Sequence, residues 1–213
     1  MSGVRVKICG LQGEDQAVAA VASGADLLGF VFAPSRRQVH PDRVRRWLQR
    51  LPRRGWEAVG VFVNLPPSQV NAIIRYCQLE WAQLSGQETP EECASIEAPV
   101  IKAFPTTALL TWKEIDAYRG RARLFLMDAF SPGVGGGSGR LCDWTKAAEM
   151  AKSVPILLAG GLNPDNVSNA ITFVRPWGVD VSSGVEVRGL KDAALMRAFV
   201  AAARQATVES RTF

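Results

Sequence analysis

The chain has 213 residues, of which 21% are charged and 47% hydrophobic, and its formal net charge is +5. This length and balance fit one globular domain with a sizeable core. No apolar run reaches the roughly 18 residues that a membrane-spanning helix needs, and residues 1–7 enter a strand pattern with no signal peptide. We therefore expect a cytoplasmic protein with no membrane partner.

Strand-like and helical patterns alternate eight times along the chain. Strands are expected at 4–9, 26–32, 57–63, 80–84, 99–104, 123–128, 155–159 and 178–182. Helices are expected at 14–23, 41–51, 67–77, 90–96, 111–118, 144–152, 164–174 and 192–206. Alternation of this kind predicts a parallel sheet covered by helices. Eight units favour an α/β fold closed into a single-domain (β/α)8 TIM barrel over residues 1–213, with an open doubly wound sheet as the alternative.

Eight arginines fall between Arg36 and Arg54. Apolar residues at helical spacing run through the same segment, at Val44, Trp47, Leu48 and Leu51. This spacing indicates an amphipathic helix whose outer face is solvated arginine. No aromatic residues are interleaved to form a basic recognition motif, so no nucleic-acid partner is expected.

The cysteines do not have the spacing of a metal site. Cys9, Cys77, Cys93 and Cys142 show no Cys-x-x-Cys or Cys/His pattern, and His40 is the one histidine of the chain. We therefore expect free thiols and no metal. Cys77 and Cys93 are expected to fill helix faces, and His40 is expected at the surface or as a helix cap.

Polar side chains end several of the expected strands. In the first strand the even positions are apolar and should pack against helices, so Lys7 and Cys9 should face the barrel axis. Cys9 is the last residue of that strand, and Asp128 ends the sixth. Asp180 and Ser182 share one face at the end of the eighth. Because chemistry in barrels occurs at the carboxyl ends of the strands, these residues predict one polar mouth.

Cys9 and Asp128 are the candidates for acid–base chemistry. A cysteine at this position can be a nucleophile, a general base or a small hydrophobe. The rim position, the inward parity and the neighbouring Lys7 favour a reactive thiol, since a cation stabilises the thiolate. Asp128 can be a structural cap or a general acid, and the acid role requires a pKa raised by burial.

Two apolar runs near the C-terminus each end in a turn of small residues. Gly160 and Gly161 follow one run, and Ser182, Ser183 and Gly184 follow the other. In a barrel these turns follow strands 7 and 8, where backbone N–H groups can bind phosphate. The alternative is that the glycines merely turn the chain.

Three further features bear on the site. Asn163 is expected to cap the seventh helix and Pro164 to begin it, which would place the helix N-terminus beside the glycines. The glycine-rich segment 131–139 is expected to be an active-site lid, with a plain flexible loop as the alternative. Lys102 can form a Schiff base, but more often such a lysine is paired with a carboxylate.

Several short motifs follow one another along residues 4–203. They are KICGL at 7–11, GADLLGFVF at 24–32, GVFVN at 60–64, GSG at 137–139, DW at 143–144, LAGGLNP at 158–164 and VDVSSGVE at 179–186. In this order they closely resemble the phosphoribosylanthranilate isomerase family, barrel enzymes of tryptophan synthesis. The resemblance implies a cofactor-independent Amadori rearrangement of a small phosphorylated substrate, N-(5-phosphoribosyl)anthranilate, by a monomer or homodimer.

The resemblance also implies roles for individual residues. Asp128 would protonate the ribose ring oxygen, and Cys9 would remove the C2′ proton. Arg37 would orient the anthranilate carboxylate, a task that suits its planar fork. Asp180 would contact sugar hydroxyls or the amine. The phosphate would be held by Gly160, Gly161, Ser182, Ser183 and Gly184.

The chain departs from the family pattern in three places. Ser85 stands where the family usually has a histidine. The loop 33–38 is one residue short, so Arg36 can substitute for Arg37. The expected lid is one residue longer than in the family pattern, and residues 140–142 replace the usual lysine, threonine and aromatic.

Two other functions compete with this interpretation. One is a related sugar-phosphate isomerase of the histidine pathway or a dual-substrate version, which uses an aspartate where Cys9 stands. The other is an inactive barrel that binds phosphorylated ligands as a regulator, which the presence of both Cys9 and Asp128 disfavours.

Overall fold

A computed structural model describes residues 3–52, 54–106, 110–128 and 143–206. The segment 131–139, expected to be a lid, and Cys142 lie outside the described residues. Within the described part of the chain, none of the helices combines the length and the apolar character that crossing a membrane requires.

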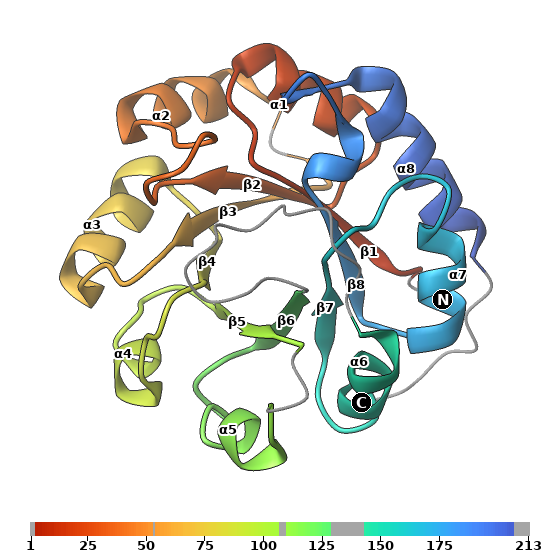
Figure 1. Cartoon of the computed structure of the whole chain (residues 1–213). Helices are drawn as coiled ribbons and strands as arrows, with labels where there is room; N and C mark the ends of the chain where they lie inside the picture. The colour runs from red at the N-terminus through yellow and green to blue at the C-terminus, as the bar shows by residue number, and fades with distance from the viewer. Residues whose placement is uncertain (1–2, 53, 107–109, 129–142, 207–213) are drawn as a thin grey trace.

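Eight parallel strands close into a barrel in chain order, with β8 pairing back onto β1 (Figure 1). The strands are β1 Arg5–Cys9, β2 Leu27–Val31, β3 Glu57–Phe62, β4 Trp81–Leu84, β5 Val100–Pro105, β6 Leu124–Asp128, β7 Ile156–Leu158 and β8 Gly178–Val181. The predicted (β/α)8 barrel is confirmed.

The helices lie outside the strands, one after each (Figure 1). They are α1 Glu14–Ala22, α2 Pro41–Arg50, α3 Pro67–Cys77, α4 Pro90–Ala94, α5 Trp112–Asp116, α6 Trp144–Met150, α7 Val167–Val174 and α8 Ala193–Gln205. Between β8 and α8 the chain adds a 3-10 turn η1 Ser183–Val185 and a short hairpin, β9 Glu186–Val187 and β10 Leu190–Lys191.

Polar side chains begin several of the helices. His40 accepts a hydrogen bond from the Asp42 N–H at the start of α2, as its expected capping role requires. Asp143 and Asp192 accept bonds from the first-turn N–H groups of α6 and α8. Such caps satisfy N–H groups that have no partner inside the helix.

The expected start of the seventh helix is wrong. Oδ1 of Asn163 accepts hydrogen bonds from the N–H groups of Asp165 and Asn166, at 2.9 and 3.1 Å. This local bonding forms a turn over residues 164–166, and α7 begins at Val167 instead of Pro164. An asparagine that bonds two residues ahead favours a turn over a helix start.

The core has two parts, which follow from the period-2 alternation of the strands. One lies between the strands and the helices, and includes the apolar face of α2 with Val44, Trp47 and Leu48. The other fills the inside of the barrel with Leu27, Val59, Ile101, Ala103, Leu124, Leu126, Leu157 and Ala159.

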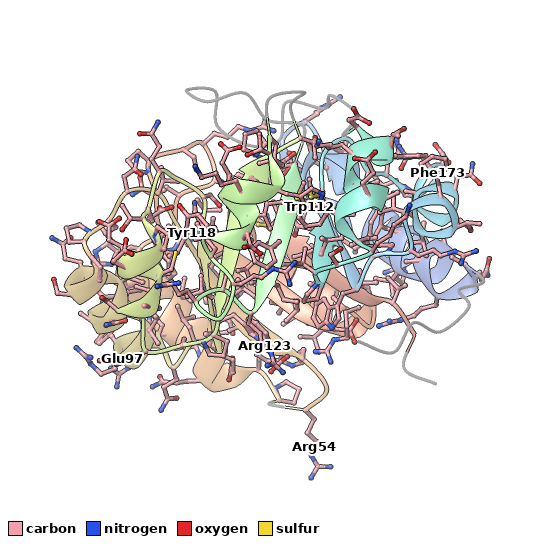
Figure 2. The ribbon with its side chains drawn as sticks, turned by 90° about the horizontal axis from the view of Figure 1, so that it is seen from below. Arg54, Glu97, Trp112, Tyr118, Arg123 and Phe173 are labelled. Carbon is pink, nitrogen blue, oxygen red and sulfur yellow. The ribbon has the colours of Figure 1, made fainter. Side chains whose placement is uncertain are left out.

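The two ends of the barrel carry different residues. Seen from the side, Arg54, Glu97 and Arg123 lie toward the end where the strands begin (Figure 2). The polar residues expected in the active site belong to the other end, where the strands finish. The arginine-rich segment therefore runs from one end of the barrel, at Arg54, to the other, at Arg36.

Candidate active site

Lys7 and Asp180 form a buried ion pair inside the barrel. They are paired in register between β1 and β8, and Nζ of Lys7 lies 2.8 Å from Oδ1 of Asp180. The Lys7 side chain is 0% exposed. Burial lowers the pKa of Lys7, but the charges and hydrogen bonds of Asp180 and Cys9 together outweigh burial, and the pKa is raised. The inward direction predicted for Lys7 is confirmed.

The thiol of Cys9 also points into the barrel. A Cβ added at Gly29, the residue paired with Cys9 on β2, would lie 2.9 Å from Sγ of Cys9 and 3.2 Å from Cε of Lys7. Glycine at position 29 therefore leaves the space that both side chains occupy. Cys9 is 7% exposed and ends β1 at the mouth.

Burial raises the pKa of the Cys9 thiol, while Lys7 lowers it and Asp180 raises it again. The sequence-based expectation that Lys7 favours the thiolate is right in sign. The net shift is nevertheless upward, because the buried thiolate is desolvated and the charge of Lys7 is already balanced by Asp180. The resting thiol is therefore protonated at neutral pH.

Arg37 lies across the turn that follows Cys9. Gly10 has a φ of +80°, and a Cβ there would lie 2.5 Å from Cδ of Arg37 and 3.3 Å from Oγ of Ser182. Arg37 is 6% exposed, and its Nε and Nη2 donate to the carboxylate of Glu186 at 2.7 and 3.0 Å. Arg36 is exposed and donates to the same carboxylate at 3.0 Å. Arg37 is thus the buried arginine of the loop.

Glu186 and Lys191 are charged residues to which no sequence pattern assigns a role, and the structure places both beside the predicted site. They face each other across the β9–β10 hairpin, and Nζ of Lys191 lies 2.7 Å from Oε1 of Glu186. Burial raises the pKa of Glu186, but hydrogen bonds from Arg37 and Lys191 outweigh burial and hold the pKa below its usual value. A charged residue in a short hairpin normally indicates solvated surface, so no sequence signal singled out either residue.

The turns after β7 and β8 lie against each other. A Cβ at Gly184 would overlap the carbonyl oxygen of Leu162. Gly160 and Gly161 have φ values of +84° and +67°, a region that favours glycine. The N–H groups of these two glycines and of Ser183 and Gly184 donate to no partner among the described residues. Four N–H donors at adjoining turns, none with a partner in the described part of the chain, form a seat suited to an anion.

The β4 strand carries a smaller polar pair. Nε2 of Gln83, in β4, donates to Oγ of Ser85, the residue that directly follows the strand, at 3.0 Å. Lys102 is buried and donates to Glu88 at 2.9 Å and to the Gly86 carbonyl at 2.8 Å. The interpretation of Lys102 as an interior charge paired with a carboxylate is therefore the one the structure supports.

Asp128 ends β6 and is half-buried. Its carbonyl oxygen accepts from the N–H and hydroxyl of Thr106 at 2.8 and 2.9 Å. Cys9, Asp180, Arg37 and Ser182 gather around the ends of β1 and β8, while Asp128 approaches the same mouth from β6. The arrangement offers a thiol and a carboxyl for proton transfer, together with an anion seat.

The model of the N-(5'-phosphoribosyl)anthranilate isomerase family matches residues 6–202. An isomerase of this name from Desulforudis audaxviator is 47% identical over 201 residues, covering 94% of this chain and 98% of that protein. A phosphoribosyl anthranilate isomerase structure from Thermus thermophilus has a TM-score of 0.83 at 36% identity, covering 93% of this chain and 98% of the other. A further isomerase structure, bound to reduced 1-(o-carboxyphenylamino)-1-deoxyribulose 5-phosphate, has a TM-score of 0.79 at 38% identity, covering 94% and 98%.

Proposed function

The chain belongs to the N-(5'-phosphoribosyl)anthranilate isomerase family of tryptophan biosynthesis, and from this premise we propose that Cys9 is its general base and Asp128 its general acid. The reaction is the Amadori rearrangement of N-(5-phosphoribosyl)anthranilate, an aldose-to-ketose isomerisation. The observation that carries the proposal is the position of the Cys9 thiol, inside the barrel at the mouth, on a strand whose end is joined to the turn after β8 by the Ser182 hydroxyl.

Protons move between the substrate and these two groups. Asp128 protonates the ribose ring oxygen, and the ring opens to a Schiff base. Cys9 as thiolate removes the C2′ proton, and the enolamine relaxes to the 1-deoxyribulose ketone. In that relaxation C1′ gains a proton and the C2′ hydroxyl loses one. The proton that Cys9 took is passed on to C1′ and the hydroxyl proton restores Asp128, so both residues return to their starting protonation states, and we propose that no cofactor takes part.

Two anionic groups of the substrate match two features of the mouth. The phosphate fits the N–H groups of Gly160, Gly161, Ser183 and Gly184, which have no described partner, and we assign Ser182, which precedes Ser183 in the same turn, to this phosphate site. The anthranilate carboxylate fits an arginine of the β2 loop. We assign this contact to Arg37, because it is buried and its Cδ packs at the position of a Gly10 Cβ, directly after Cys9. Asp180 is assigned to the sugar hydroxyls or the amine.

Replacement of the two proton-transfer groups tests the proposal. Cys9→Ala and Asp128→Asn should each lower kcat by about 100-fold or more, the range of general acid–base contributions. A substrate analogue should still bind both variants. Normal turnover by Cys9→Ala would show that another group is the base.

Cys77→Ala is the matched control for the thiol. Cys77 is also buried, at 2% exposure, and burial raises its pKa to about 11. It lies on α3 and donates to the Pro41 carbonyl, away from the mouth. Full activity in Cys77→Ala with loss in Cys9→Ala would assign the effect to the mouth.

Turnover of N-(5-phosphoribosyl)anthranilate by the purified chain also separates the isomerase from an inactive phosphate-binding barrel. A cytoplasmic location and a monomeric or homodimeric state stay predictions. Size-exclusion chromatography with light scattering distinguishes the two oligomeric states.

A further inference from the structure

A buried cation lies behind the turn after β8, and the proposed reaction does not use it. The Lys191 side chain is 0% exposed. Its Nζ donates to the Ser182 carbonyl at 2.9 Å, the Ser182 hydroxyl at 3.2 Å and Oε1 of Glu186 at 2.7 Å. An ammonium has three N–H groups, so these partners use all of them. Lys191 is therefore held in one geometry.

Both partners of Lys191 also contact residues at the mouth of the barrel. The Ser182 hydroxyl donates to the carbonyl of Cys9 at 3.1 Å, which links the β8 turn to the end of β1. Oε1 of Glu186 accepts from Nε of Arg37 at the same 2.7 Å as from Lys191. One ammonium thus holds the phosphate turn directly and Arg37 through a shared carboxylate.

The cluster carries an excess of positive charge. Three cations, Arg36, Arg37 and Lys191, surround the single carboxylate of Glu186. Burial lowers the pKa of Lys191, and Glu186 opposes that shift without reversing it. A buried charge acts more strongly than a solvated one on an anion that binds nearby. A phosphate at the β8 turn would supply negative charge next to this cluster.

We propose that Lys191 is a positioning residue for the phosphorylated substrate, which fixes the Ser182 turn and, through Glu186, the Arg37 guanidinium, both beside the turn that follows Cys9. The inference rests on the proposed phosphate site. Lys191 itself does not touch the substrate. Lys191 therefore acts mainly on substrate binding, and less on proton transfer.

Lys191→Met tests this role. KM should rise by about 10-fold or more, and the inhibition constant of inorganic phosphate should rise with it. The reason is that the variant loses the charged bonds of Lys191 to the Ser182 turn and to Glu186. The value of kcat should change less than KM. Lys191→Arg, which keeps the charge, should recover part of the lost phosphate affinity, and it also serves if Lys191→Met does not fold.

Arg204→Met is the matched structural control. Arg204 also pairs with a carboxylate, Asp26, and donates to the carbonyls of Val4 and Gly24, but at the opposite end of β1. The Arg204→Met variant should have a lower Tm and an unchanged KM. If Lys191→Met lowered Tm in the same way and left KM and phosphate inhibition unchanged, the positioning role would be overturned.

A double variant tests the route through Ser182. In a Ser182→Ala background the further rise in KM from Lys191→Met should be smaller than in the parent, because the bond between Lys191 and the Ser182 hydroxyl is already absent while the bond to the backbone carbonyl remains. Full additivity would exclude the hydroxyl as part of this route. Failure of the proposed function is distinguishable, since it would appear as unimpaired turnover in Cys9→Ala and not in these binding measurements.

Discussion

The thiol of Cys9 occupies the space that a side chain at position 29 would need. The two residues are paired in register across β1 and β2, and a Cβ at Gly29 would lie 2.9 Å from Sγ of Cys9 and 3.0 Å from its Cα. The Cα belongs to the backbone and cannot move aside as the end of a flexible side chain does. Glycine at position 29 is thus a condition for the position of the thiol.

Gly29→Ala should therefore reduce activity through Cys9. The added methyl group displaces the thiol, so kcat should fall while inorganic phosphate inhibits as before. Overpacking of this kind typically costs about 1–3 kcal/mol of stability, which denaturant unfolding would measure. Parent-like kcat would show that the thiol has room elsewhere at the mouth.

The pH profile should report the raised pKa of Cys9. Burial raises this pKa above 9.0, with Lys7 opposing the shift. The proposed base is the thiolate, so kcat/KM should increase with pH along an ascending limb whose midpoint lies above the ordinary pKa of a thiol. Measurement from about pH 6 to about pH 10 at constant ionic strength gives the free-enzyme value. An ascending limb with its midpoint below the ordinary thiol pKa would contradict the raised pKa of Cys9.

The barrel was predictable because its signals are local. The run expected at 57–63 is β3 Glu57–Phe62, and the helix expected at 67–77 is α3 Pro67–Cys77. Alternation in the first strand also predicted the inward direction of Lys7 and Cys9. The start of α7 was not predictable in the same way, because Asn163 can cap a helix or close a turn, and both use the same oxygen.

The charged part of the site depends on contacts between residues that are far apart in the sequence. Arg37 and Glu186 are 149 residues apart in the chain, and neither spacing nor periodicity indicates that they pair. The net pKa shift of Cys9 could not be predicted from the sequence for a related reason. The sequence placed Lys7 next to it, but only the fold brings Asp180 to neutralise Lys7 and excludes water from the thiol.

Ser183→Asp should weaken substrate binding. The new carboxylate would stand beside the N–H groups of Ser183 and Gly184 and repel a phosphate bound there. KM should rise by about 10-fold or more, as expected for removal of a charge-assisted contact. Ser183→Asn, which is similar in size but uncharged, is the control and should raise KM less. An unchanged KM in Ser183→Asp would place the phosphate elsewhere.

Lys7→Met should destabilise the protein by about 3–5 kcal/mol, because it leaves the buried carboxylate of Asp180 without its partner. The pKa of Lys7 is raised above 10.5, so the stability from the pair is fully present below pH 10.5 and is lost as pH rises through the folded-state value. Urea unfolding of the parent should therefore show a decline above pH 10.5 that is absent in Lys7→Met.

The double variant Lys7→Met/Asp180→Leu separates stability from function. Replacing both partners by apolar residues removes the unpaired charge, so much of the lost stability should return. Activity should not return with it, because Asp180 is assigned to the substrate and Lys7 lowers the pKa of Cys9. A stable and fully active double variant would show that the pair serves the fold alone.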